Sequence, residues 1–371
     1  MPRLIYFSPI PWGGLYQRPQ HTARILSEHF DVLWVEPKTL SHPKPPPAKV
    51  NLSFLALPVF PTNAKRPILR RLARLAERMP LLGSWLERRQ AALLRKALDG
   101  QRDPILFFGH PEMAPLTKAF PDSPLIYDHM DDVLGFGEPS PILRRKLENL
   151  VKRANVVNAT SERLAADMEL LGAKKCLRVG NGVEFARFAE GSSLPEPAAL
   201  SALPRPRALY LGSLAEWFDF DLLYEVARRM PNLCFPLVGP LRPDLEHRKA
   251  EAPGNVHFLG ARPYTEVPAW MSRCEIGIIP FLRTPLTEAV DPVKLHEYLA
   301  SGLPVVATPF SRELQSHGEA VSLAPDADAF AEALGTLLAL PPDGESFKAL
   351  AASRDWRRIM EPILLELKKL T

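Results

Sequence analysis

The chain of 371 residues has few cysteines and no long hydrophobic run. Its three cysteines are odd in number, far apart and set among apolar neighbours, which favours buried free thiols over a disulfide or a zinc site. No run approaches the roughly 18 apolar residues of a membrane-spanning helix. The first residues also lack the apolar segment and the cleavage site of a signal peptide. We therefore expect a cytoplasmic chain with no metal site.

A further absence concerns the opening of the chain. No G-x-G-x-x-G follows the first predicted strand at 4–8, so a Rossmann dinucleotide site is unsupported. The loop after this strand instead carries Gly13 and Gly14, which would let the backbone pass close to a ligand. A purely structural turn explains the two glycines equally well.

The composition is that of a folded globular protein. Hydrophobic residues make up 46% and charged residues 24% of the chain, which is long enough to form two hydrophobic cores. A formal net charge of +4 and a pI of about 8.9 permit an anionic partner without naming one. We expect no nucleic-acid partner.

Short apolar strands alternate with helical segments through both halves of the chain. This alternation predicts βαβ units and hence two doubly wound parallel sheets. A proline-rich connector at 41–48 predicts an exposed loop, and residues 190–206 have linker composition. One last amphipathic helix is predicted from Ser353 onward. The predicted strands cover 4–8, 32–35, 50–57, 105–109, 125–128, 154–160 and 177–179 in the first half, and 208–212, 234–239, 256–260, 276–280, 305–308 and 321–323 in the second.

Residues 65–98 predict a pair of strongly basic amphipathic helices. Ten basic residues stand against two acidic ones, which is a local net charge of +8. The helices could belong to the core and present a solvated basic face. Alternatively they could lie on the inner face of an anionic membrane, where each basic residue contributes about 1 kcal/mol. The apolar positions at helical spacing are Ile68, Leu69, Leu72, Leu75, Ala76 and Met79.

Three carboxylates crowd the segment Tyr127–Asp132, which runs out of a predicted buried strand. Ligands in open α/β sheets gather beyond the carboxyl ends of the strands, so these acids lie where chemistry is expected. Crowding raises the pKa of at least one carboxyl, which suits a general base that takes a proton from a hydroxyl. We predict Asp128 or Asp131 as the base or as the residue that orients the acceptor. The alternative is a polar turn that caps the next helix.

Residues 291–309 read as one structural unit with chemistry on one face. Asp291 is a favourable N-cap, and the proline after it fits the first helical position, so a helix is predicted from here to Gly302. Lys294 would add a cation to a helix N-terminus, where phosphate is favoured. Glu297, one turn later, could accept hydrogen bonds from the vicinal hydroxyls of a ribose. An ordinary amphipathic helix with an exposed Lys–Glu pair also fits this spacing.

This segment resembles the donor-binding signature of GT-B glycosyltransferases, especially the family 4-like (group 1) enzymes and the teichuronic-acid-type sugar transferases. The signature has the form P-x-K-x-x-E-Y-x-A-x-G-x-P-V-V. Many relatives carry a second glutamate eight residues before Glu297, whereas this chain has Ala289 there and Glu288 one step away. The matching residues are Pro292, Lys294, Glu297, Tyr298, Ala300, Gly302, Pro304, Val305 and Val306.

Shorter stretches carry the same resemblance. The R-P-Q-H stretch from Arg18 and the Y-D-x-x-D pattern from Tyr127 are similar to the teichuronic-acid-type subgroup. The pattern N-G-V-x-x-x-x-F at 181–188 resembles the crossing into the second GT-B domain. Residues 210–214 resemble the first donor-side loop, but the Arg and Lys that follow its glycine in many family 4 enzymes are missing. The phosphate charge would then fall mostly on Lys294.

The resemblance implies a GT-B fold of class α/β, with two Rossmann-like domains facing across a cleft. Residues 1–188 would bind the acceptor, 189–352 would bind the nucleotide sugar, and 353–371 would pack back on the first domain. No cofactor is expected beyond the donor substrate. The implied site comprises Gly13, Gly14 and Arg18 in a cleft loop, Gly212, Ser213, Gly239, Tyr264, Lys294 and Glu297 for the donor, and the catalytic candidates Asp128 and Asp131.

The implied function is transfer of a sugar, of the hexosyltransferase type, from a nucleoside-diphosphate sugar. The acceptor would be a glycan or a lipid-linked sugar in cell-surface polysaccharide synthesis. Two alternatives stay open. One is a sugar-nucleotide epimerase of the same fold, and the other is a degenerate GT-B domain that only binds nucleotide or partner proteins. The donor sugar, its base, the acceptor, the anomeric outcome and the oligomeric state are left undetermined.

Overall fold

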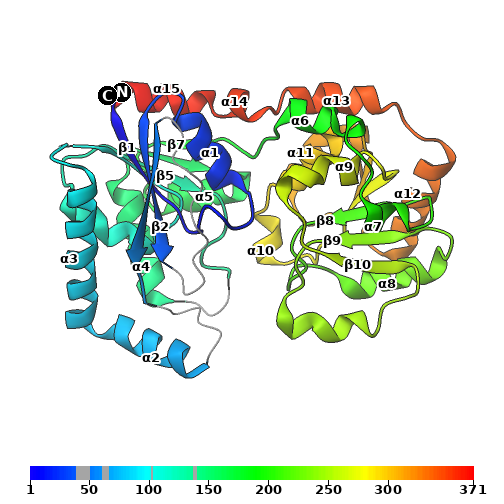
Figure 1. Cartoon of the computed structure of the whole chain (residues 1–371), viewed down its shortest axis with the longest axis horizontal. Coiled ribbons are helices and arrows are strands. Elements are labelled where there is room, and N and C mark those ends of the chain that lie inside the picture. Colours follow the sequence, from blue (N-terminus) through cyan, green and yellow to red (C-terminus); the bar gives the residue numbers. More distant parts are fainter. Residues whose placement is uncertain (39–50, 61–66, 102, 137–139) are drawn as a thin grey trace. The chain divides into compact units, whose positions relative to one another are not determined.

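A computed structural model describes residues 1–38, 51–60, 67–101, 103–136 and 140–371. The chain divides into two compact units, of which the first comprises 1–159, 164–179 and 360–371 and the second 160–163 and 180–359. Each unit is built on one parallel sheet flanked by helices (Figure 1). This confirms the prediction of two Rossmann-like α/β sheets. The predicted loop at 41–48 lies outside the described residues.

The first unit has a seven-stranded sheet in the order β3-β2-β1-β4-β5-β6-β7, with every neighbouring pair parallel. The strand order reverses between β1 and β4, which is where open α/β sheets commonly bind their ligands. The elements are β1 (Arg3–Phe7), α1 (Arg18–Leu26), β2 (Asp31–Lys38), β3 (Leu52–Pro58), α2 (Pro67–Arg78), α3 (Pro80–Ala97), β4 (Ile105–Phe108), the 3₁₀ segment η1 (Pro111–Ala119), β5 (Leu125–His129), α4 (Pro141–Arg153), β6 (Val156–Ala159), α5 (Glu162–Leu170), β7 (Cys176–Arg178) and α15 (Glu361–Lys369).

Aromatic residues fill the centre of the first sheet. The ring of Tyr6 stacks between Trp34 and Phe107, with centroids 4.9 and 5.0 Å away. The loop after β1 is tied to the next strand, because the backbone N–H of Trp12 donates to the Glu36 carboxylate at 2.6 Å. The indole N–H of Trp34 donates to the same oxygen. This loop is therefore anchored at its start, before the chain reaches its two glycines.

The second unit has a six-stranded parallel sheet in the order β10-β9-β8-β11-β12-β13, whose order reverses between β8 and β11. Its elements are α6 (Phe185–Ala189), η2 (Gly191–Ser193), α7 (Ala198–Ser201), β8 (Ala208–Leu211), α8 (Phe220–Arg229), β9 (Phe235–Val238), η3 (Pro243–Lys249), β10 (Val256–Gly260), η4 (Tyr264–Glu266), α9 (Val267–Met271), β11 (Ile276–Ile279), α10 (Pro285–Glu288), α11 (Val293–Ala300), β12 (Val305–Ala307), η5 (Arg312–Ala320), β13 (Val321–Leu323), α12 (Ala327–Ala339), α13 (Gly344–Ala352) and α14 (Trp356–Ile359).

Helix α11 is held on the sheet by Tyr298. Its hydroxyl accepts from the N–H of Leu211 at 2.8 Å and donates to the carbonyl of Leu209 at 3.0 Å. The ring lies against Gly277 of β11, where an added Cβ would stand 2.6 Å from a ring carbon. A side chain at 277 would push the helix away. The first turn of α11 is thereby set at the point where the strand order reverses.

The chain crosses between the units at Gly180 and again at Met360, whereas the sequence places these boundaries after 188 and 352. Residues 190–206 have linker composition but pack on the second unit. Leu200 there is fully buried, and Glu196 pairs with the Arg207 guanidinium at 2.7 Å. The predicted last helix is two helices, α14 and α15, separated by Met360. Only the second of them belongs to the first unit.

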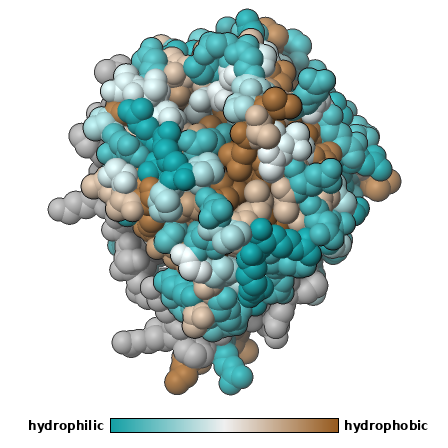
Figure 2. All heavy atoms as spheres, turned by 90° about the vertical axis from the view of Figure 1, so that its right-hand side faces the viewer, coloured by the Kyte–Doolittle hydropathy of each residue, from teal (hydrophilic) through white to brown (hydrophobic). Residues whose placement is uncertain are grey.

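The remaining expectations concern thiols and surface. All three cysteines are free, with Cys234 and Cys274 buried and Cys176 half-buried. Within the described ranges, no helix has the length and apolarity to cross a bilayer. The face seen in Figure 2 is mainly hydrophilic, with hydrophobic residues gathered toward its middle.

Candidate functional site

Two glycine loops meet at the carboxyl ends of β8 and β9. Gly212 has a φ of +136° and Gly239 a φ of +152°, a region that favours glycine. An added Cβ at Gly239 would stand 1.9 Å from the carbonyl oxygen of Gly212. The backbone of the neighbouring residue is held as well, because the Ser213 carbonyl accepts from the Tyr210 hydroxyl at 2.8 Å. Three predicted donor residues thus lie together.

Lys294 reaches this pair of loops from the first turn of α11. Its Nζ lies 3.0 Å from the Tyr210 hydroxyl and 4.2 Å from the centroid of the same ring. The ring of Phe281, which follows β11, has its centroid 4.5 Å away. An added Cβ at Gly212 would stand 2.8 Å from the Nζ. The ammonium therefore lies beside the Gly212 backbone and against two aromatic faces, as a cation–π arrangement requires.

The charge of Lys294 is left without an ion pair among the residues described. Burial lowers the pKa of Lys294 to about 7, and Glu297 opposes this shift. Burial likewise raises the pKa of Glu297 to about 7, against the opposing effects of a hydrogen bond from Tyr264 and of Lys294. Both charged forms are thus disfavoured by desolvation. A bound anion beside Lys294 would restore its ordinary protonation.

The N-terminus of α11 lacks the cap that the sequence predicts. The N-cap position belongs to Pro292, and no side chain there accepts from the helix. The Asp291 carboxylate accepts instead from the N–H of Asn181 at 2.5 Å and lies 3.2 Å from Nε2 of His296. The prediction of Asp291 as N-cap is wrong because tertiary contacts draw its carboxylate away. The N–H of Leu295 donates to the Pro292 carbonyl at 3.0 Å, and no side chain caps the N–H groups of the two residues before it.

Glu288 does not take the place of the glutamate missing at 289. Ala289 is buried, and Glu288, which ends α10, has an exposed side chain. Its carboxylate lies 3.8 Å from the Arg163 guanidinium. The second glutamate that many relatives carry is therefore not replaced by Glu288, whose exposed side chain faces Arg163.

A buried polar network stands at the carboxyl ends of the strands in the first unit. Nε and Nη2 of Arg18 donate to the two carboxylate oxygens of Asp128 at 2.9 and 3.0 Å. Asn158 adds a donor to Asp128 at 2.7 Å and accepts from the N–H of Val179 at 2.9 Å. The side chains of Arg18 and Asp128 are 3% and 0% exposed. Arg18 therefore opens α1 as a buried residue, not as part of a loop surface.

The three acids of the predicted catalytic segment have different surroundings. Asp128 is occupied by Arg18, and one oxygen of Asp132 accepts from the N–H groups of Leu134 and Gly135 at 3.3 and 3.1 Å. Asp131 is exposed and has no hydrogen-bond partner within the described residues. Surrounding protein atoms raise its pKa, Arg18 opposes this, and Asp128 and Asp132 add to it. Of the three, Asp131 is the acid whose carboxylate no described group occupies.

The glycines of the first loop lie at the surface. Gly13 and Gly14 are both exposed, and the N–H of Gly14 donates to the carbonyl of Pro11 at 3.1 Å, which closes a turn. Their contact with a ligand stays a prediction. Across the described ranges, no group of three or more His, Cys, Asp or Glu side chains is arranged to hold a metal ion.

The second unit is also the part of the chain that matches a known family. Residues 205–339 match the family model described as glycosyl transferases group 1. The Gly212 and Gly239 loops, Lys294 and Glu297 all lie within the matched range. TuaH of Bacillus subtilis (strain 168), provisionally named a teichuronic acid biosynthesis glycosyltransferase, is 28% identical over 217 residues. That match covers 55% of each chain, so this chain spans about half the length of that relative.

Solved structures share the fold over the whole chain. The Anabaena protein HepE, crystallised with UDP and glucose, superimposes with a TM-score of 0.73 at 17% identity, covering 100% of both chains. An E. coli trehalose-6-phosphate protein bound with UDP-2-fluoro glucose has a TM-score of 0.73 at 13% identity, covering 100% of this chain and 99% of the other. Sucrose-phosphate synthase from Thermosynechococcus elongatus reaches 0.72 at 17% identity, covering 100% and 98%. The predicted GT-B fold is confirmed.

Sequence reasoning did not assign a role to the aromatic rings around Lys294 or to Asn158. Tyr210 stands in the stretch that resembles the donor-side loop, and Phe281 lies two residues after the end of β11, where the strand order reverses. The position of each at a strand end was the available signal. Asn158 also stands near the end of its strand, β6, but its partners Asp128 and Val179 are distant in the sequence.

Proposed function

We propose that this protein is a glycosyltransferase that moves a sugar from a nucleoside-diphosphate sugar to a glycan or lipid-linked acceptor in cell-surface polysaccharide synthesis. The match of residues 205–339 to the group 1 family model supports the reaction class. The UDP and UDP-sugar complexes of HepE and the E. coli protein favour a UDP-hexose donor. The likeness to TuaH favours a surface-polysaccharide acceptor.

One observation carries the donor site. The Lys294 ammonium lies beside the Gly212 backbone, without an ion pair among the described residues, and Lys294 stands in the first turn of α11, which no side chain caps. A diphosphate in this position would meet a cation and unpaired backbone donors together. These same groups would stabilise the charge on the departing diphosphate, where preorganised donors are most effective. Glu297, one turn further along α11, would accept from the ribose hydroxyls.

In this proposal Asp131 is the general base that acts on the acceptor. Its raised pKa suits a group that takes the proton of the acceptor hydroxyl at neutral pH. Asp128 is not suited to that role, because both of its oxygens already accept hydrogen bonds in the interior. No cofactor enters this scheme beyond the donor substrate.

The test is thermal unfolding of the purified chain with a panel of UDP-, GDP- and dTDP-sugars, followed by product analysis with the one that binds. A donor at 100 times its dissociation constant should add about 2.7 kcal/mol to the free energy of unfolding. We expect this gain in the wild type and its loss in Lys294→Ala. The exposed Lys249, which pairs with Glu246 at 2.7 Å, provides the matched control Lys249→Ala.

The alternatives predict different results in the same experiment. An epimerase would release an altered nucleotide sugar without any acceptor. A degenerate binding domain would be stabilised by donor but would form no product with any acceptor, an outcome that the missing glutamate at 289 and the missing Arg/Lys pair would explain. Stabilisation of Lys294→Ala equal to that of the wild type would contradict the donor site itself.

A further inference from the structure

Helix α2 turns its apolar side toward solvent. Ile68, Leu72 and Leu75 follow one another at helical spacing, so they share one stripe, and Met79 comes directly after the helix. Their exposed fractions run from 48% for Met79 to 74% for Ile68. Among the side chains of α2 that the structure describes, the small Ala73 is buried. The stripe that would ordinarily pack into a core is therefore the outer side of α2.

The exposed apolar surface continues into the first turns of α3. Leu81, Leu82 and Trp85 are all exposed, and Leu81 reaches 82%. Seven of the sixteen large hydrophobic residues that are exposed in the described ranges lie between 68 and 85, while the others are spread over the chain. Such a concentration marks an interaction surface, whereas single exposed apolar residues do not. We call residues 68–85 the apolar patch.

Basic side chains border the apolar patch. The guanidinium of Arg89 lies 5.5 Å from the centroid of the Trp85 ring. Arg88, one residue earlier, is exposed, as is Arg71 beside the stripe of α2. The sequence from 65 to 98 has ten basic and two acidic residues, a net charge of +8. An apolar face edged with arginine and lysine, with a tryptophan at the boundary, is the composition of a surface that rests in a lipid headgroup layer.

The charge decides which partner can cover this surface. A second copy of the chain would bring the same +8 segment against itself in a two-fold contact, which like-charge repulsion opposes. An anionic bilayer offers the opposite charge and an apolar interior at once. We propose that α2 and the start of α3 bind the surface of a membrane rich in anionic phospholipid. The inference goes beyond glycosyl transfer and does not depend on it, because binding is measured without turnover.

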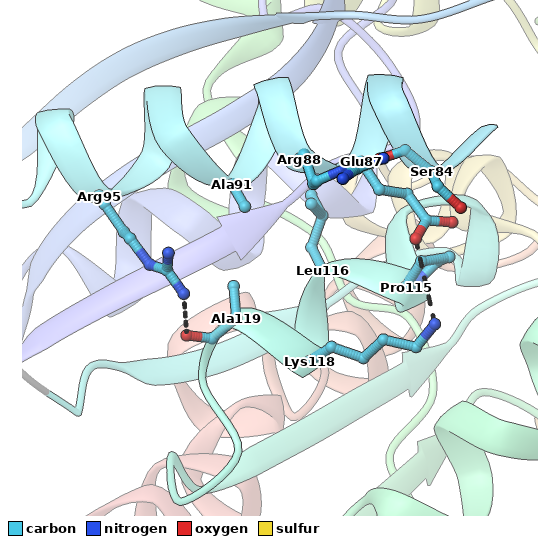
Figure 3. A pocket seen from close by; sticks show the side chains of 9 residues that line it. All are labelled: Ser84, Glu87, Arg88, Ala91, Arg95, Pro115, Leu116, Lys118 and Ala119. Carbon is cyan, nitrogen blue, oxygen red and sulfur yellow. Dashed lines mark hydrogen bonds and ion pairs between the residues drawn. The ribbon is translucent and has the colours of Figure 1, made fainter. Parts of the chain in front are cut away.

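A groove next to the patch fits a phosphate headgroup. It lies between α3 and η1, has a volume of about 520 Å³, and is lined by Arg88 and Arg95 from one side and Lys118 from the other (Figure 3). Arg88 and Lys118 are exposed at its edge. Glu87 lies 4.0 Å from Lys118, which leaves an excess of positive charge. In the bound state these side chains would contact lipid phosphates while the patch enters the acyl boundary.

The first test is flotation of the purified full chain with vesicles. We expect binding to phosphatidylglycerol mixed with phosphatidylcholine at low salt, weaker binding as salt rises, and none to phosphatidylcholine alone. The double variant Leu72→Gln/Leu75→Gln should bind roughly tenfold or more weakly. Its matched control is Leu170→Gln/Leu340→Gln, which changes two exposed leucines elsewhere and should bind like the wild type.

The charge is tested separately. Arg88→Gln/Arg89→Gln should lose about fivefold in vesicle affinity per arginine. The exposed pair on α4 supplies the control Arg144→Gln/Arg145→Gln, which should retain binding. Thermal unfolding of every variant checks that folding is unchanged. Quenching of fluorescence by brominated lipid gives a readout in the intact chain, since the quenched component should disappear in Trp85→Phe.

Three results would overturn the proposal. The first is a wild type that ignores anionic vesicles at low salt, and the second is equal binding of the wild type and the Leu72/Leu75 variant. The third is self-association of the wild type that this variant abolishes, which would assign the patch to a second copy. If the true partner were an acidic protein, the chain would be folded and monomeric but would not bind the vesicles.

Discussion

The two units treat charge at their strand ends in opposite ways. In the first, the Arg18 guanidinium and the Asp128 carboxylate satisfy each other in the interior, and Asn158 completes the set. In the second, Lys294 lies against aromatic rings and a glycine backbone, and desolvation lowers its pKa to about 7. A paired buried charge contributes to structure, whereas an unpaired and desolvated one is poised for a ligand of opposite charge.

The same contrast separates neighbouring acids within five residues of one another. Asp128 is enclosed and ion-paired, while Asp131 is exposed and raised in pKa. Residue type alone does not distinguish them. A substitution at Asp131 should therefore lower the rate of transfer, whereas a substitution at Asp128 should lower the stability of the fold.

The largest expected effect is on turnover, from Asp131→Asn. Removing a general base typically costs 10²- to 10⁴-fold in rate. The fold should be unaffected because the side chain is exposed and has no partner in the described part of the chain. Steady-state transfer rates with a saturating nucleotide sugar measure the loss, and donor-induced stabilisation checks that the donor still binds. Transfer at the wild-type rate would retire Asp131 as the base.

The next effect is on stability, from Asp128→Asn. Breaking one side of a buried ion pair leaves the Arg18 charge uncompensated, which should lower the free energy of unfolding by about 3–5 kcal/mol. Urea unfolding measures the difference. The exposed Asp122 supplies the control Asp122→Asn, which should change the free energy by no more than about 0.5 kcal/mol. Equal stabilities of the two variants would show that the network does not hold the first unit together.

The smallest effect is a pH dependence of donor affinity. The pKa of Lys294 is about 7 in the free protein, below its ordinary value, and a bound diphosphate should raise it. The cation is then already present below pH 7, and affinity should fall by up to about tenfold per pH unit above it. Titration calorimetry with a nucleotide sugar over roughly pH 6 to 9 measures how donor affinity changes with pH on both sides of that pKa.

Glu297 titrates in the same range, since its pKa is also about 7. The variant Lys294→Met separates the two residues, because any slope that remains in it belongs to Glu297. A wild-type affinity that is flat across this range would mean that Lys294 is charged in the free protein. The contrast between the unpaired charge of Lys294 and the ion-paired charge of Arg18 would then not hold.

The strands and the order of elements could be read from the sequence because both follow from local pattern. Runs such as Leu4–Phe7 and Val305–Ala307 are apolar and β-branched or aromatic, and they form buried parallel strands as predicted. The helix that carries Lys294 was also predictable, from its proline, its apolar spacing and Gly302 at its end. Its cap was not, because Asp291 finds its partner at Asn181, 110 residues away.

The sequence by itself determined the two α/β halves, the family resemblance and the place of Lys294 at a helix N-terminus, because each depends on residues close together in the chain. Only the tertiary structure decided that Asp128 is paired with Arg18 while Asp131 is exposed, since these partners meet across 110 positions. It also decided that the apolar stripe of α2 faces outward. A helical pattern specifies that one side is apolar, and packing alone specifies what that side meets.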